Sequence, residues 1–179
     1  RDALLRLARQ QRAEVGGAGL SLRALAREMG LVSSAVYRYV ASRDDLLTLL
    51  IIESYETLGS VAEQADASVT DRADVFGRWM AIARRTRVWA VENPADFGLI
   101  YGTPVPGYVA PPDTIPAALR FTMVLTGLLA DAQTLGCRPT APIGAHPAGD
   151  RLRDDLTALA SVSGIEAGPD LMAVGLMGW

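Results

Sequence analysis

The sequence predicts an all-α protein in which a small three-helix N-terminal domain precedes a larger helical bundle. Apolar residues recur at three- and four-residue steps over most of the chain, and no stretch alternates in the manner of a half-buried strand. Up to Asp45, 8 arginines against 5 acids give a net charge of +3, whereas beyond it 9 arginines against 15 acids give −6. With 179 residues and 50% hydrophobic composition, the chain is neither disordered nor fibrous. We therefore expect one domain over residues 1–45 and a second over residues 46–179.

Capping signals define the helices of the N-terminal part. The hydroxyl of Ser21 can accept a hydrogen bond from an unpaired backbone N–H at a helix start, and Gly30 suits the left-handed position after a helix end. Ser42, followed by Asp44 and Asp45, predicts another helix start because these carboxylates complement the helix dipole. The expected helices cover residues 2–15, 22–29, 33–39 and, from the Ser42 cap, about 43–64.

Similar signals continue through the second part. Asn93, Pro94 and Asp96 fit the N-cap, first and third positions of a helix, and Gly136 follows a long apolar periodic stretch. No stop signal precedes Trp179, so we expect the natural protein to continue beyond it. The expected helices are 72–92, 94–101, 115–135, 150–162 and a last one from 168 to 179, with a proline- and glycine-rich loop over 102–112.

The segment 20–47 carries the pattern of a helix-turn-helix motif. Two short helices meet at a tight turn containing Gly30, and the small side chain of Ala26 allows them to pack closely. In this motif the N-terminal residues of the second helix meet base edges in the major groove of DNA. Hydroxyl and methyl groups suit that contact, and arginine or tyrosine suits phosphates. The candidate base readers are Ser33, Ser34 and Ala35, and the candidate phosphate contacts are Tyr37, Tyr39 and Arg43. Arg23, at the start of the preceding helix, could reach a guanine or a phosphate.

These residues resemble the DNA-binding head of the tetracycline-repressor (TetR) family of bacterial regulators. Val32 departs from the family pattern, in which a serine caps the recognition helix, and Ser33 could take over that cap. The resemblance implies phosphate contacts from Ser21, Tyr37, Tyr39 and Arg43, and base contacts from Arg23, Ser33, Ser34 and Tyr37. The stretch 93–102 is similar to the WHG subtype of the family's C-terminal domain, in which a tryptophan such as Trp179 is followed by more helix. The matching positions of the head are Ala26, Gly30, Tyr37, Ser42, Leu46 and Leu47.

The resemblance implies a cytoplasmic, homodimeric regulator, most often a repressor, that leaves a palindromic operator when a small apolar or aromatic molecule binds. The alternative is a helical protein that binds small molecules without binding an operator. An apolar last helix suits a two-fold dimer interface through Leu171, Met172, Val174 and Leu176. Aromatic and methionine side chains suit an effector pocket, although each one alone reads more readily as ordinary core. The candidates for that pocket are Phe76, Trp79, Met80, Trp89, Phe97, Tyr101, Phe121 and Met123.

Other classes of function lack a signal in the sequence. One cysteine, Cys137, excludes an intrachain disulfide and fits a reducing compartment, and one histidine, His146, excludes a multi-histidine metal site. No phosphate-binding glycine motif, nucleophile elbow or paired-cysteine zinc spacing occurs, so we expect neither an enzyme nor a cofactor. The apolar stretch 46–52 is far shorter than the ~20 residues of a membrane span. The arginines at 84, 85 and 87 suit a solvated helix face better than an anion site.

Overall fold

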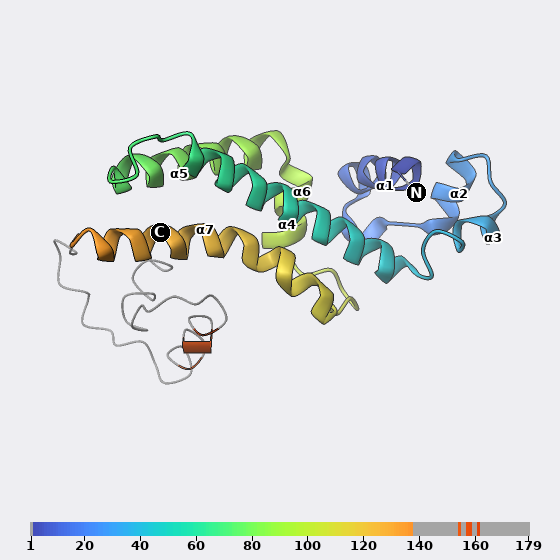
Figure 1. Ribbon diagram of the computed structural model, residues 1–179. Helices are drawn as coiled ribbons and strands as arrows, with labels where there is room; N and C mark the ends of the chain where they lie inside the picture. Colours follow the sequence, from blue (N-terminus) through green and yellow to red (C-terminus); the bar gives the residue numbers. More distant parts are fainter. Residues whose placement is uncertain (1, 138–153, 155–156, 159–160, 162–179) are drawn as a thin grey trace. The chain divides into compact units, whose positions relative to one another are not determined.

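A computed structural model describes residues 2–137 together with residues 154, 157, 158 and 161. Every regular element in this described part is helical, which confirms the predicted all-α class (Figure 1). Only four residues of the predicted helix 150–162 are described, and the predicted helix 168–179 lies outside the described residues. The proposed dimer residues therefore also lie outside them: Leu171, Met172, Val174 and Leu176. The elements in order are α1 (Asp2–Val15), η1 (Gly17–Gly19), α2 (Leu22–Glu28), α3 (Ser33–Val36), α4 (Arg43–Ala67), α5 (Val75–Glu92), α6 (Pro94–Tyr101), η2 (Pro112–Thr114) and α7 (Ile115–Thr134).

Local capping chemistry places most helix ends where the sequence predicts them. Ser21 Oγ accepts from the Ala24 N–H at 3.4 Å, and Ser42 Oγ accepts from the Asp45 N–H at 3.0 Å. Gly136, after α7, has a left-handed φ of 73°, as expected of a glycine at a helix C-terminus. These ends depend on contacts within a few residues, and a sequence pattern can therefore identify them.

Three helix boundaries and one cap differ from the prediction. α3 ends at Val36 rather than at residue 39, and α4 ends at Ala67 rather than near residue 64. α5 begins at Val75 rather than at residue 72, because Asp74 Oδ1 accepts from the Gly77 N–H at 2.8 Å and so caps that position. Asn93 precedes α6, but its side chain donates to the Trp89 carbonyl at 2.9 Å instead of capping α6.

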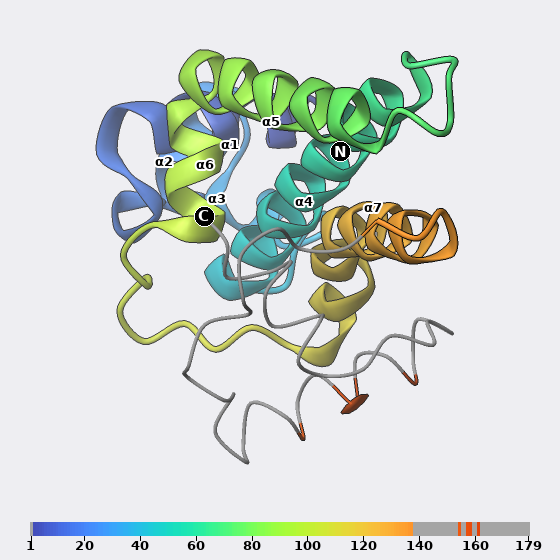
Figure 2. The ribbon, with the colours of Figure 1, turned by 90° about the vertical axis from the view of Figure 1, so that its left-hand side faces the viewer.

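The chain divides into two compact units that do not follow chain order. The first comprises Arg1–Leu58 and Arg87–Ala118, and the second comprises Gly59–Thr86 and Leu119–Trp179. In the first unit α1, α2 and α3 pack against the start of α4, and α6 lies beside α1 in both views (Figures 1 and 2). The buried core of this unit consists of Leu4, Ala8, Leu20, Leu22, Leu25, Ala26, Val36, Val40, Leu46, Leu47 and Leu50.

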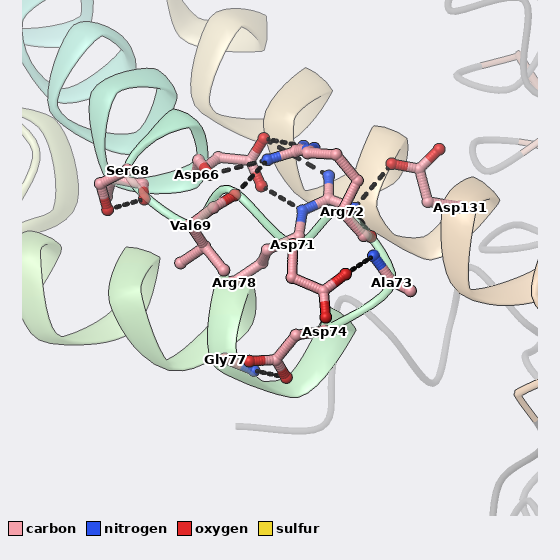
Figure 3. A network of polar contacts seen from close by, with 11 residues as sticks. Asp66, Ser68, Val69, Asp71, Arg72, Ala73, Asp74, Gly77, Arg78 and Asp131 are labelled. Carbon is pink, nitrogen blue, oxygen red and sulfur yellow. Dashed lines mark hydrogen bonds and ion pairs between the residues drawn. The ribbon is translucent and has the colours of Figure 1, made fainter.

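The second unit combines a small apolar core with a network of ion pairs. Its core consists of Ala62, Ala65, Ile82, Leu125 and Leu128. The guanidinium of Arg78, whose side chain is 3% exposed, pairs with Asp66 and with Asp131, each at 2.8 Å (Figure 3). Burial alone raises the pKa of Asp66, but hydrogen bonds from Arg78 and Arg72 outweigh it, so the pKa lies below its usual range.

The helix α7 is more apolar than the sequence interpretation recognises. The segment Pro112–Thr134 is long and apolar enough to cross a membrane by length and composition alone, whereas the sequence interpretation considers only the shorter stretch at 46–52. Within the second unit, however, Arg120 and Asp131 of α7 pair with Glu63 and Arg78, and Leu125 and Leu128 are core residues. The helix α7 is thus joined to its unit by both ion pairs and apolar core contacts.

Candidate nucleic-acid interface

The turn between α2 and α3 is held by backbone hydrogen bonds around a left-handed glycine. Gly30 has φ 67°, and its N–H donates to the Arg27 carbonyl at 3.0 Å. The Leu31 N–H reaches back to the Ala26 carbonyl at 2.9 Å, which completes the pair of bonds of a Schellman motif. This closure sets the angle at which the chain enters α3.

The short helix α3 has one buried side and one solvated side. Val36 is fully buried against the core that includes Leu25 and Ala26. Ser33 and Ser34, in its first turn, are exposed. The N-cap position is held by Val32 without a side-chain hydrogen bond, and Ser33 is the first helical residue, so Ser33 does not take over the cap. The hydroxyls of the first turn are therefore available to another molecule.

Exposed aromatic and cationic side chains precede and follow that first turn in the sequence. Tyr37 and Tyr39, in the turn that follows α3, are 52% and 42% exposed. Arg23, Arg27 and Arg38 are exposed, and no described residue forms an ion pair with any of them. The sequence interpretation does not single out Arg27 and Arg38. A helical projection of 22–39 could have found both, since neither falls on the apolar positions that pack the motif.

Three other residues predicted at this interface are partly engaged in the fold. Arg43 Nη2 donates to the carbonyls of Gly17 and Ala18 at 3.0 and 3.1 Å, which ties η1 to the start of α4. The Ser21 N–H donates to Gln11 Oε1 at 2.8 Å while its hydroxyl caps α2, and Ala35 is half-buried. Contacts of these three residues with DNA stay predictions.

The aromatic residues predicted for an effector pocket occupy both units. In the first unit Trp89 is buried, and the rings of Phe97 and Tyr101, both partly exposed, lie with centroids 5.2 Å apart. Burial raises the pKa of the Tyr101 hydroxyl. Phe97 and Tyr101 of the predicted set therefore form an aromatic pair, and Tyr55, which is not among the predicted pocket residues, meets Tyr101 edge-on with centroids 6.3 Å apart.

In the second unit the remaining candidates have different surroundings. Trp79 and Phe121 pack against the core, Met80 is half-buried, and Phe76 is 73% exposed. Met123 lines a cavity of about 300 Å³ together with polar residues of the Arg78 network. A single apolar pocket built from the whole set stays a prediction. Within the described residues no group of three or more histidine, cysteine, aspartate or glutamate side chains could hold a metal ion.

Comparison with known proteins identifies the family. The family described as "Tetracyclin repressor-like, C-terminal domain" matches residues 79–179. HTH-type transcriptional regulators of Mycobacterium tuberculosis (Rv1816, strain H37Rv) and of Mycobacterium bovis (Mb1846) are each 55% identical over 113 residues, which is 62% of this chain and 47% of theirs. The chain thus spans about half the length of the curated relatives it matches, and these relatives are named as regulators rather than enzymes.

Solved structures share the same architecture. The crystal structure of the proposed regulatory protein SCO4313 has a TM-score of 0.73 and 29% identity, covering 98% of this chain and 76% of its own. The TetR-family regulator PfmR of Thermus thermophilus has a TM-score of 0.57, covers 97% of this chain and 95% of its own, and at 18% identity supports the fold alone. The helical head with its left-handed turn, the helices beyond it and the matched C-terminal domain together show that this chain belongs to the tetracycline-repressor family.

Proposed function

We propose that this chain is a DNA-binding transcriptional regulator that acts as a cytoplasmic homodimer on a palindromic operator. The observation that carries the proposal is the exposed first turn of α3, where Ser33 and Ser34 present their hydroxyls, together with exposed arginines of the same motif that no described residue pairs. The curated relatives, which this chain covers by about half, are named as transcriptional regulators of the helix-turn-helix type. The assignment of the C-terminal domain to the WHG subtype belongs to this proposal and depends on residues 93–102.

Some of the exposed side chains suit base edges, and others suit the phosphates of the DNA backbone. Ser33, Ser34 and the methyl of Ala35 are short enough to let α3 approach base edges, and Arg23 can read a guanine. Tyr37 and Tyr39 offer phenolic hydroxyls to phosphates on either side. Two such heads in a dimer read half-sites about one helical turn apart, ~34–36 Å.

The first experiment selects bound sequences from random duplex DNA and then measures affinity for the consensus at several salt concentrations. Arg38→Ala is expected to weaken binding to every sequence and to reduce the salt slope by about 1, because one phosphate contact is lost. Arg85→Ala, which removes another exposed arginine, this one from α5, is the matched control and is expected to change neither. Arg23→Ala should instead relax the preference at one operator position. Equal effects of Arg38→Ala and Arg85→Ala would place the interface elsewhere.

The same proposal includes a small apolar or aromatic effector that releases the operator and a repressor role. The candidate contacts are the aromatic and methionine side chains described above, which offer large apolar area. Native mass spectrometry of the purified protein would reveal a co-purified molecule, and its removal should change operator affinity. If no DNA sequence is enriched while a small molecule still binds, the alternative of a small-molecule-binding helical protein without an operator would replace this proposal.

A further inference from the structure

A cavity of about 750 Å³ lies within the first unit, between the C-terminal half of α1, η1, the start of α6 and the loop that follows α6. This volume falls within the range of ~300–1,000 Å³ typical of small-molecule sites. None of the aromatic residues predicted for the effector pocket lines it. Its apolar lining comes from Ala13, Ala18, Pro94, Leu99, Pro104 and Val105.

A buried cation with unused donors lines the same cavity. The side chain of Arg12 is 3% exposed, and its Nη2 pairs with Asp96 Oδ1 at 2.8 Å. Its Nε and Nη1 are buried, and neither has a hydrogen-bond acceptor among the described residues. A guanidinium does not lose its proton in proteins, so these donors stay charged and unmatched. Burying such donors without an acceptor costs stability, and an acceptor supplied by a ligand would remove that cost.

The existing partner of Arg12 cannot serve all of its donors. Asp96 Oδ1 also accepts from Ser54 Oγ at 2.7 Å, which holds the carboxylate toward α4. The sequence predicts Asp96 at the third position of α6, and the structure places it there and also pairs it with Arg12 of α1 and Ser54 of α4. Asp96 is thereby fixed on one side of the guanidinium, and the remaining donors are left for another acceptor.

We propose that this cavity binds a small molecule with an apolar body and a single carboxylate, which Arg12 holds. A carboxylate matches the planar geometry of a guanidinium and forms charge-assisted hydrogen bonds with it. Arg9 also lines the cavity, but it is 45% exposed and pairs with Glu53 at 3.3 Å, so Arg12 is the cation on which the proposal depends. The carboxylates of Glu92 and Asp96 line the cavity too, which disfavours ligands with several negative charges such as polyphosphates.

A ligand in this cavity touches α1 and η1 of the predicted DNA-binding domain and α6 of the following domain at the same time. It would therefore differ in position from an effector held by the aromatic residues. Binding of the ligand does not depend on the proposed operator function, since it requires only the cavity and Arg12.

Isothermal titration calorimetry without DNA tests the proposal, with octanoate and 4-phenylbutanoate as probes and 4-phenylbutanamide as the neutral analogue. Saturable binding of at least one carboxylate at one site per chain is expected, with the amide at least about tenfold weaker because the charge-assisted bonds to Arg12 are lost. Arg12→Met should weaken carboxylate binding by at least about tenfold, whereas Arg6→Met, at an exposed position of the same helix outside the cavity, should leave it unchanged.

A second variant keeps the test decisive if Arg12→Met disturbs folding. Ala13→Phe fills the cavity from the exposed side of α1 while retaining Arg12 and Asp96, and should abolish binding. Ala3→Phe, near the other end of α1, is its control and should bind as the wild type does. The proposal is overturned if neither carboxylate binds saturably at millimolar concentration, if the amide binds as well, or if Ala13→Phe retains full affinity. If the wild-type protein binds a carboxylate but selects no DNA sequence, the proposed function is contradicted and the ligand proposal stands.

Discussion

Replacing Gly30 isolates the contribution of one left-handed residue to the helix-turn-helix. Gly30 has φ 67°, and a Cβ built there meets no atom within 4 Å. Gly30→Ala therefore introduces no clash, and its cost is the conformational penalty of a side chain in the left-handed region, roughly 1–2 kcal/mol. Asparagine occupies this region more readily than alanine, so Gly30→Asn should lose less. The same alanine substitution at Gly127, inside α7 and also in open space, should instead stabilise by about 0.5–1 kcal/mol.

Urea unfolding followed by circular dichroism measures all three variants against the wild type under one condition. The order expected for the free energy of unfolding is Gly127→Ala, wild type, Gly30→Asn and Gly30→Ala, from highest to lowest. Because the turn also sets the entry of α3, Gly30→Ala should weaken operator binding as well. If Gly30→Ala were as stable as the wild type, the turn would accept another conformation, and the backbone reasoning for α3 would be refuted.

Three further predictions concern the ion-pair network and a helix cap. Arg78→Met should lower the free energy of unfolding by about 2–3 kcal/mol, less than for a fully buried pair because Asp131 is half exposed, and an unchanged urea midpoint would contradict it. The ionised form of Asp66, whose pKa is lowered from 3.8, stabilises the folded state above that pH and loses this effect as the pH falls through the folded pKa. The stability difference between the wild type and Asp66→Asn should therefore shrink as the pH falls from neutral to below 3.8, and a constant difference would show that ionisation is irrelevant. Ser42→Ala should cost about 1 kcal/mol through loss of the bond to the Asp45 N–H, whereas Ser42→Asp should retain most of it; equal unfolding curves for all three proteins would exclude a capping role.

Sequence reasoning succeeds here where one structural feature depends on residues close together in the chain. Ser21, Gly30 and Ser42 each act within four residues, through a cap or a left-handed turn, and their positions are readable without the fold. Asn93 shows where the same reasoning fails. Asparagine is a common N-cap residue, but the preceding helix offers the Trp89 carbonyl as an acceptor close by. The Asn93 side-chain amide donates to that carbonyl and does not cap α6.

The candidate interface was likewise readable in part. The exposed hydroxyls of Ser33 and Ser34 follow from a short helix whose apolar residue Val36 faces the core. The engagement of Arg43 was not readable, because the carbonyls of Gly17 and Ala18 reach its guanidinium only after α1 and α4 have packed. Arg43, which the sequence predicts to contact a phosphate, thus also joins η1 to the start of α4.

By itself the sequence determined the helical class, most helix ends and the helix-turn-helix with its family, because periodicity, caps and left-handed glycines are local properties. The tertiary structure decided which charged groups are buried and what they meet. Arg12 reads as one more polar position of an amphipathic helix, and only packing of α1 beside α6 and α4 removes it from water and sets it against Asp96. Burial and the partners of a charge depend on distant segments brought together, and this is why the cavity beside Arg12 could be found only in the folded chain.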